Sequence, residues 1–180
     1  NLASNKADIL KNADLLTTMF EKRGFTISRI VTPGSPVLVA RREAPDAVGT
    51  LTFYMHYDGQ PTEAKDWTMG APFAPKAFKG QTPFDIAASA GPIDPDVRVY
   101  ARAVADDKGP IVAFLAAIDG LGDAKAVVPW NLRVVLDGEE EAAIRRTAYW
   151  VRLIIEITLV SNNCRAAGTE TIPSNAGSST

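Results

Sequence analysis

Three segments of strand-like sequence each end directly in a cluster of polar residues, and this pattern most limits the folds open to the chain. The segments are 50–56, 97–102 and 131–136. Apolar and polar side chains alternate along the first of them, which is typical of a β-strand with one buried face. Because chemistry in sheets flanked by helices gathers where strands end, we expect a functional site at these three strand ends.

Two helix-like segments lie among these strands in the sequence. Residues 5–23 carry an apolar stripe at steps of three and four, with Asn5 placed to cap the helix and Gly24 to end it. Residues 110–121 carry a second stripe and begin at Pro110, a favourable first residue of a helix. Further strand-like segments are 25–31 and 37–41. This order of elements predicts the α/β class, with a mixed β-sheet flanked by helices.

The remaining sequence divides into a long loop, an ambiguous segment and a tail. Residues 57–97 are rich in proline, glycine and aspartate, and we expect irregular loop there with one short strand at 75–79. Residues 142–160 fit a helix or, towards their end, a strand. Apolar periodicity is lost over 161–180, where we expect a disordered tail. The predicted organisation is therefore one domain over 1–160, followed by that tail.

Composition excludes several classes of protein. The 180 residues are 46% hydrophobic and 22% charged, which is typical of a globular domain. A formal net charge of -2 gives no basic field for nucleic acid or an anionic membrane, and no apolar run approaches the roughly 18 residues that span a bilayer. The lone cysteine, Cys164, excludes an internal disulfide and a multi-cysteine zinc site. The lone histidine, His56, excludes a three-histidine metal site within this chain.

The first polar cluster contains that histidine, at the end of the segment 50–56. A lone histidine is more often a structural or surface residue than a metal ligand. Two features favour a ligand here, since His56 lies at a strand terminus and Asp58 lies two residues further on, on the same side of an extended chain. An aspartate beside a ligating histidine fixes its tautomer and raises its basicity.

The other two clusters consist of carboxylates. Asp106 and Asp107 follow the second segment, and a helix cap explains one aspartate but not two in succession. The acidic run 137–141 would usually be a solvated loop, but here it follows an apolar strand end, where adjacent carboxylates repel unless a cation offsets them. Neighbouring side chains of extended backbone point in opposite directions, so Glu140 and Glu141 can serve as one metal ligand and one base. An imidazole with several carboxylates is a zinc-type ligand set with a spare general base.

Taken together, the motifs resemble those of the co-catalytic zinc exopeptidases and deacylases. This family comprises glutamate carboxypeptidases, carnosinase-type dipeptidases, aminoacylases and succinyl-diaminopimelate desuccinylase, and the likeness covers about residues 5–143. The pieces that carry it, in the family's order, are His56-Tyr57-Asp58-Gly59-Gln60-Pro61, Trp67, Pro72-Phe73, Val99-Tyr100-Ala101-Arg102, Asp106-Asp107-Lys108-Gly109-Pro110 and Gly138-Glu139-Glu140-Glu141. The resemblance implies a zinc exopeptidase-like three-layer α/β/α fold, incomplete here. It also implies metal-dependent hydrolysis of a peptide or N-acyl amino acid amide bond.

The resemblance further implies a role for each polar residue of the three clusters. His56 binds one zinc, Asp106 bridges two zinc ions and Glu141 binds the second, with manganese or cobalt as alternative metals. Glu140 is the general base, and Asp58 is the partner that orients His56. A cis peptide bond after Asp106 and a small peptide or N-acyl amino acid substrate are also implied.

The sequence also departs from the family pattern. Residues 142–146 stand where the family has a Gly-Ser pair and a helix. A later metal-binding aspartate has only Asn162 as its analogue, and no second histidine is present for the last ligand. We therefore expect a truncated chain with family sequence ending near Ala143, little activity alone, and association of copies through exposed sheet surface. The alternative function is a non-catalytic fragment or binding module that retains the fold.

Overall fold

A computed structural model describes residues 2–142 of the chain. The predictions for 161–180, and for 142–160 apart from its first residue, lie outside this part. The described residues form two α-helices, seven β-strands in two sheets, and three short helical turns. The helices are α1 (Lys6–Glu21) and α2 (Gly109–Asp123). The strands of the larger sheet are β1 (Thr26–Ile30), β2 (Val37–Arg42), β3 (Thr50–His56) and β7 (Asn131–Asp137). Those of the smaller sheet are β4 (Lys76–Lys79), β5 (Thr82–Phe84) and β6 (Val97–Tyr100), and the short turns are η1 (Ala64–Asp66), η2 (Val104–Lys108) and η3 (Glu140–Ala142).

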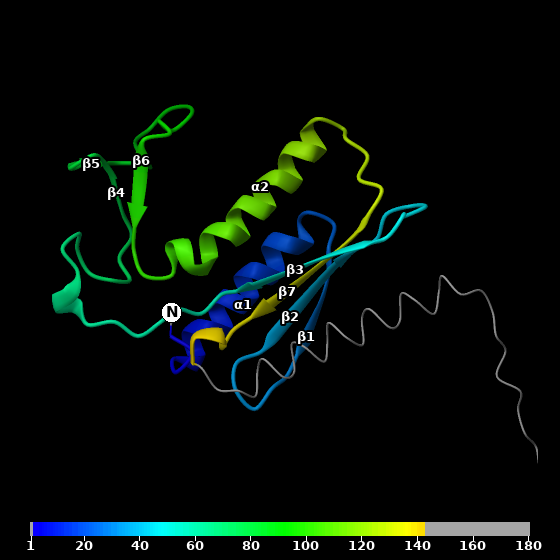
Figure 1. The fold of residues 1–180 in the computed structure, drawn as a ribbon, viewed down its shortest axis with the longest axis horizontal. Coiled ribbons are helices and arrows are strands. Elements are labelled where there is room, and N and C mark those ends of the chain that lie inside the picture. The colour runs from blue at the N-terminus through cyan, green and yellow to red at the C-terminus, as the bar shows by residue number, and fades with distance from the viewer. Residues whose placement is uncertain (1, 143–180) are drawn as a thin grey trace, which may run out of the picture.

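The larger sheet is mixed, as the sequence predicted. Its strand order is β1-β2-β7-β3, in which β1, β2 and β7 pair antiparallel and β3 pairs parallel to β7 (Figure 1). The register of the parallel pair sets His56 opposite Asp137. The carboxyl ends of β3 and β7 therefore meet at one edge of the sheet, which brings together two of the three polar clusters.

Both described helices pack on the same face of this sheet. Each helix buries one apolar stripe against side chains of β2, β3 and β7, and this forms the main core. The buried helix residues are Ile9, Ala13, Leu16, Phe20, Ile111, Leu115 and Ile118. The α/β class is thus confirmed, while the second helical layer implied by the resemblance is not among the described residues. Neither of the two helices is long and apolar enough to cross a membrane.

The ends of α1 follow the predicted local chemistry. The Asn5 side chain accepts a hydrogen bond from the Asp8 backbone N–H at 3.3 Å, which satisfies one of the free donors of the first turn. After the helix, Gly24 adopts a φ of 78°, a left-handed conformation in which glycine carries no steric penalty. The stripe of α1 is therefore fixed in register against the sheet.

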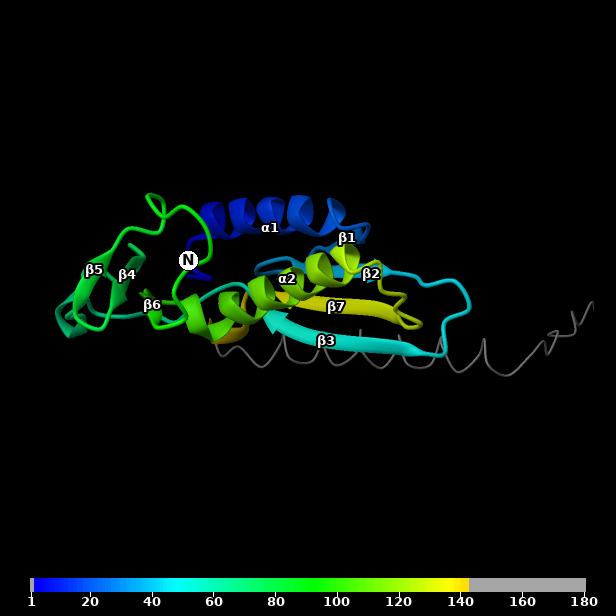
Figure 2. The ribbon, with the colours of Figure 1, turned by 90° about the horizontal axis from the view of Figure 1, so that it is seen from above.

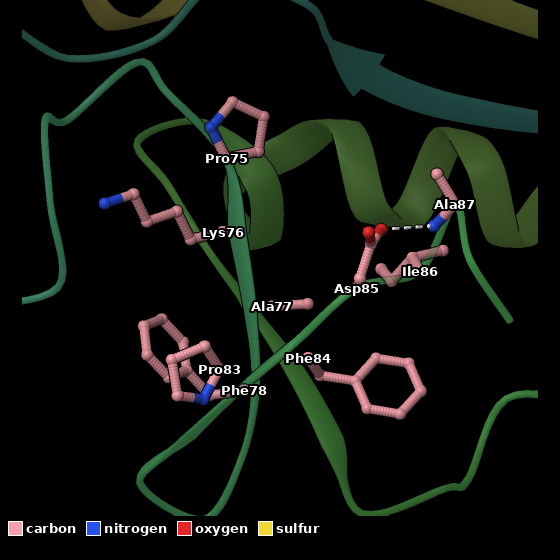
Figure 3. A pocket seen from close by; sticks show the side chains of 9 residues that line it. All are labelled: Pro75, Lys76, Ala77, Phe78, Pro83, Phe84, Asp85, Ile86 and Ala87. Carbon is pink, nitrogen blue, oxygen red and sulfur yellow. Dashed lines mark hydrogen bonds between the residues drawn. The ribbon is translucent and has the colours of Figure 1, made fainter.

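Residues 57–97 are mostly irregular, as expected, and the predicted short strand at 75–79 is β4 of the smaller sheet. Its strands are antiparallel in the order β5-β4-β6, and Figure 2 shows them lying beyond the start of α2, apart from the larger sheet. The sequence missed β5 because it has three residues and contains Pro83, which has no N–H to donate and is typical of an edge strand. A hollow on this sheet, bordered by Phe78, Phe84 and Ile86 (Figure 3), is lined by none of the predicted site residues.

Candidate metal centre

The three polar clusters of the sequence meet at the carboxyl edge of the larger sheet. His56 is the last residue of β3, and Asp58 follows it. Asp106 lies in η2, immediately before α2, and Glu140 and Glu141 lie in η3, which follows β7. Since β3 and β7 are neighbouring parallel strands, their ends deliver these side chains to one place.

The imidazole of His56 lies between two carboxylates. Its side chain is 9% exposed, with Nδ1 3.2 Å from Oδ1 of Asp58 and Nε2 2.9 Å from Oδ1 of Asp106. A third carboxylate oxygen, Oε2 of Glu140, lies 4.0 Å from Nε2. Both ring nitrogens therefore face acceptors, and Nε2 faces the side of the site on which the glutamates lie.

Asp58 connects the two strand ends. It is completely buried, and while Oδ1 contacts His56, Oδ2 accepts a hydrogen bond from the backbone N–H of Glu141 at 3.0 Å. The Lys108 ammonium donates to the backbone carbonyl of Asp58 at 3.4 Å. Burial lowers the pKa of Lys108, although the charge of Asp58 opposes that effect. One aspartate thus fixes both the histidine ring and the turn that carries the glutamates.

Asp106 and Asp107 have separate tasks. The peptide bond between them is cis, as the resemblance implied. The carboxylate of Asp106 faces Nε2 of His56, while Oδ2 of Asp107 accepts a hydrogen bond from the backbone N–H of His56 at 3.2 Å. Neither aspartate caps α2, the alternative explanation for one of them, because Lys108 occupies the cap position and no side chain makes a cap bond there. The second aspartate instead holds the backbone of the histidine.

The acidic run 137–141 contains two residues that form structural hydrogen bonds, Asp137 and Glu139, and two that lie near His56, Glu140 and Glu141. Asp137 is buried, and its two oxygens accept hydrogen bonds from the Glu139 backbone N–H at 2.9 Å and the Tyr54 hydroxyl at 3.2 Å. Oε2 of Glu139 accepts from the Ser35 backbone N–H at 3.1 Å. The sequence did not predict the hydrogen bonds that hold the site residues in place, which are made by Ser35, Tyr54, Asp107, Asp137 and Glu139. The one signal in the sequence is Asp-Gly directly after a strand, a typical turn pair.

Burial and neighbouring charges shift the pKa values of His56 and Glu141. Burial alone lowers the pKa of His56, but the hydrogen bonds with Asp58 and Asp106 outweigh it and raise that pKa to about 9. Burial raises the pKa of Glu141, and the charges of Asp106 and Glu140 add to the effect. The hydrogen bonds with Asp58 and Asp106 thus favour a positive charge at His56, which is the kind of charge that a divalent cation also supplies.

The donors present fit a metal ion. One ligand atom each from His56, Glu140 and Glu141 lie within 4.8 Å of one another. Oδ1 of Asp106 adds a further oxygen beside Nε2. Imidazole nitrogen with carboxylate oxygen is a donor set that zinc and similar divalent ions accept. Because a carboxylate oxygen of each glutamate lies within 4.8 Å of a ring nitrogen of His56, the geometry does not distinguish the metal ligand from the base. The assignment of these roles to Glu141 and Glu140 rests on the resemblance and stays a prediction.

This donor set, at the carboxyl edge of a mixed sheet covered by helices, is the arrangement expected of a metallopeptidase domain. The sequence model of Peptidase family M20/M25/M40 matches residues 52–160, which is more than half of the chain. The chain belongs to this peptidase family. The match continues past Ala143, where the motifs had placed the end of the family sequence. The motifs that carry the resemblance end at Glu141, so they could not show how far the family sequence continues beyond it.

Related proteins agree with this assignment. The chain is 26% identical over 110 residues to the human Beta-Ala-His dipeptidase, covering 61% of this chain and 18% of that protein. Against the Cys-Gly metallodipeptidase of Schizosaccharomyces pombe the identity is again 26% over 110 residues, covering 61% and 20%. The crystal structure of an M20 family metallo-carboxypeptidase from Sulfolobus solfataricus superposes with a TM-score of 0.60 and 31% identity, covering 78% of this chain and 28% of that one. The chain thus spans about a fifth of the length of the dipeptidases it matches.

Proposed function

We propose that this site belongs to a metal-dependent hydrolase of peptide or N-acyl amino acid amide bonds. The observation that supports this most is the buried imidazole of His56 between the carboxylates of Asp58 and Asp106, with Glu140 close to Nε2. Relatives named as Beta-Ala-His and Cys-Gly dipeptidases support a short peptide as the substrate class.

The residues that would hold the metal are His56, Asp106 and Glu141. We propose zinc, with two ions in a complete site and Asp106 shared between them; manganese or cobalt would accept the same donors. When bound, such an ion polarises the substrate carbonyl and makes water more acidic. The donor set described above supports this assignment, since it combines one imidazole nitrogen with several carboxylate oxygens.

The other residues orient these donors and move protons. Asp58 holds Nδ1 of His56 and so leaves Nε2 for the metal, while Asp107 fixes the backbone of the same residue. The Glu140 carboxylate is 44% exposed, so water and substrate can reach it. Glu140 accepts a proton as the oxygen of water attacks the amide carbon, and returns it to the nitrogen as the carbon–nitrogen bond breaks.

We also propose that the 180-residue chain alone is a poor hydrolase. Among residues 2–142, with Asp106 counted for both ions, His56 and Glu141 give each ion two protein ligands, whereas a catalytic zinc ion normally has three. This count also supports the second candidate function, a metal-binding module that retains the fold without turnover. The two candidates differ in one measurable property, the hydrolysis of substrate by the metal-loaded chain.

Zinc titration and turnover assays test these proposals together. We expect the purified chain to bind zinc saturably by isothermal titration calorimetry, and His56→Ala to abolish that binding, while the surface variant Lys79→Ala leaves it unchanged. Slow hydrolysis of dipeptides or N-acyl amino acids that disappears in His56→Ala would favour the hydrolase over the module. A native chain that binds no zinc would contradict both.

A further inference from the structure

One buried carboxylate beside the site has no part in the chemistry proposed above. Asp137 is the last residue of β7 and is 1% exposed. Its backbone is fixed by the parallel register, which sets it opposite His56, and by the Tyr57 N–H, which donates to its carbonyl at 2.8 Å. Asp137 therefore stands where the strand ends and the turn with the two glutamates begins.

The side chain of Asp137 acts on that turn directly. Oδ1 accepts the N–H of Glu139, two residues further on, which closes an Asx-type turn and bends the chain out of the strand. Oδ2 accepts the hydroxyl hydrogen of Tyr54 from the neighbouring strand β3. Burial raises the pKa of Asp137. Within residues 2–142, Asp137 forms no salt bridge with a lysine or an arginine. Its hydrogen bonds therefore offset the cost of burying the carboxylate.

The next two residues are held as tightly. A Cβ atom on Gly138 would lie 2.5 Å from the hydroxyl oxygen of Tyr57, so this position admits no side chain. The carboxylate of Glu139 accepts the Ser35 N–H and fills the space in which a side chain at Gly34 would otherwise lie. The segment 137–139 is thus clamped between the end of β3 and the loop before β2, and only the two following glutamates extend from it into the site.

We propose that Asp137 is a positioning residue of the metal centre, which sets the place of Glu140 and Glu141 through its bonds to Glu139 and Tyr54. It anchors the near end of the turn, while Asp58 anchors the far end through the Glu141 N–H. The proposal rests on the proposed metal-dependent function of this site. Without the Asp137 carboxylate the turn loses its near anchor, the glutamates occupy more conformations, and metal binding weakens.

Three variants of the 180-residue chain distinguish the effect of the Asp137 hydrogen bonds from the effect of its negative charge. Asp137→Ala removes both hydrogen bonds. Asp137→Asn removes the charge but keeps an acceptor for the Glu139 N–H, with an amide that can donate to the Tyr54 hydroxyl. Tyr54→Phe removes one bond and leaves the carboxylate. Asp123→Ala at the exposed end of α2 and Tyr100→Phe on β6 are the matched controls.

Two measurements report on the metal rather than on turnover. Zinc affinity is measured by calorimetry, and the visible spectrum of bound cobalt reports the arrangement of its ligands. We expect Asp137→Ala to raise the Kd for zinc 10- to 100-fold, within about the range found for partners of metal ligands, and to change the cobalt spectrum. Tyr54→Phe raises the Kd about fivefold, as expected for loss of one hydrogen bond. Asp137→Asn and both controls stay within about threefold of native.

Each outcome decides the matter. Equal affinity and an identical cobalt spectrum for Asp137→Ala and the native chain overturn the positioning role. So does an Asp137→Asn variant as weak as Asp137→Ala, since charge would then be the cause. If Asp137→Ala loses the native circular-dichroism spectrum, the variant does not fold and Tyr54→Phe is used in its place. Native zinc affinity in Tyr54→Phe then overturns the proposal. A native chain without zinc binding contradicts the proposed function itself, which the other results leave intact.

Discussion

The protonation of His56 in the metal-free chain tests the geometry of the site most sharply. Burial alone lowers the pKa of an imidazole, but Asp58 and Asp106 accept hydrogen bonds from its two nitrogens and raise its pKa from 6.5 to about 9. At about 1.4 kcal/mol per pKa unit, this shift corresponds to roughly 3 kcal/mol in favour of the protonated ring in the folded state.

The sign of the linked effect on stability follows from the direction of the shift. The folded chain binds the proton more tightly than the unfolded chain, so the contribution of His56 to the free energy of unfolding is complete below pH 6.5. It is lost as the pH rises through about 9. We therefore expect urea denaturation at several pH values to give a free energy of unfolding that falls by up to roughly 3 kcal/mol across this interval.

Proton NMR measures the pKa directly. His56 is the only histidine of the chain, so its imidazole resonance needs no assignment by mutation. In a chelator-treated sample we expect a midpoint near pH 9. Asp58→Asn lowers the midpoint toward 6.5, Asp106→Asn lowers it less, and the exposed variant Asp96→Asn leaves it in place. A native midpoint at or below 6.5 would refute the reasoning, because the two carboxylates would then not hold the ring.

Three further predictions concern the turn after β7 and the edge of the larger sheet. Glu140→Gln should retain bound zinc by calorimetry and Glu141→Gln should lose affinity; the reverse result would mean that the two roles are exchanged. Gly138→Ala should lower the free energy of unfolding in urea by about 1–3 kcal/mol, because its Cβ would meet the Tyr57 hydroxyl, and an unchanged midpoint would contradict that contact. Light scattering should detect association of copies through β3, which is an edge strand of the larger sheet within residues 2–142, and a monomer at all concentrations would refute it.

The sequence predicted the central elements of the fold because their signals are local. Residues 50–56 were predicted as a strand and form β3, since alternation of apolar and polar side chains needs no knowledge of the partner strands. Met55 and Phe53 face the core as that alternation requires, although Leu51 is 40% exposed. In the smaller sheet, β4 and β6 correspond to the strands predicted at 75–79 and 97–102. Only β5 was missed, because it has three residues, contains proline and is defined by its pairing with β4.

The site was predictable to the extent that its residues stand at strand ends. Strand termini and the family resemblance identified the side chains that meet around His56. The bonds that hold them could not be predicted, because they depend on tertiary register. Tyr54 and Asp137 are 83 residues apart in sequence and meet only through the pairing of β3 with β7. The contact of Asp107 with the His56 backbone likewise depends on where η2 crosses the end of β3.

The most direct test of the metal centre is a crystal structure of the zinc-loaded chain with anomalous diffraction at the zinc absorption edge. We predict an anomalous peak within about 2.0–2.2 Å of Nε2 of His56 and of a carboxylate oxygen of Asp106, with Glu141 as a ligand of the site. Asp58 should remain bonded to Nδ1. A peak at another place in the chain, or zinc bound through Nδ1 with Asp58 displaced, would contradict the account.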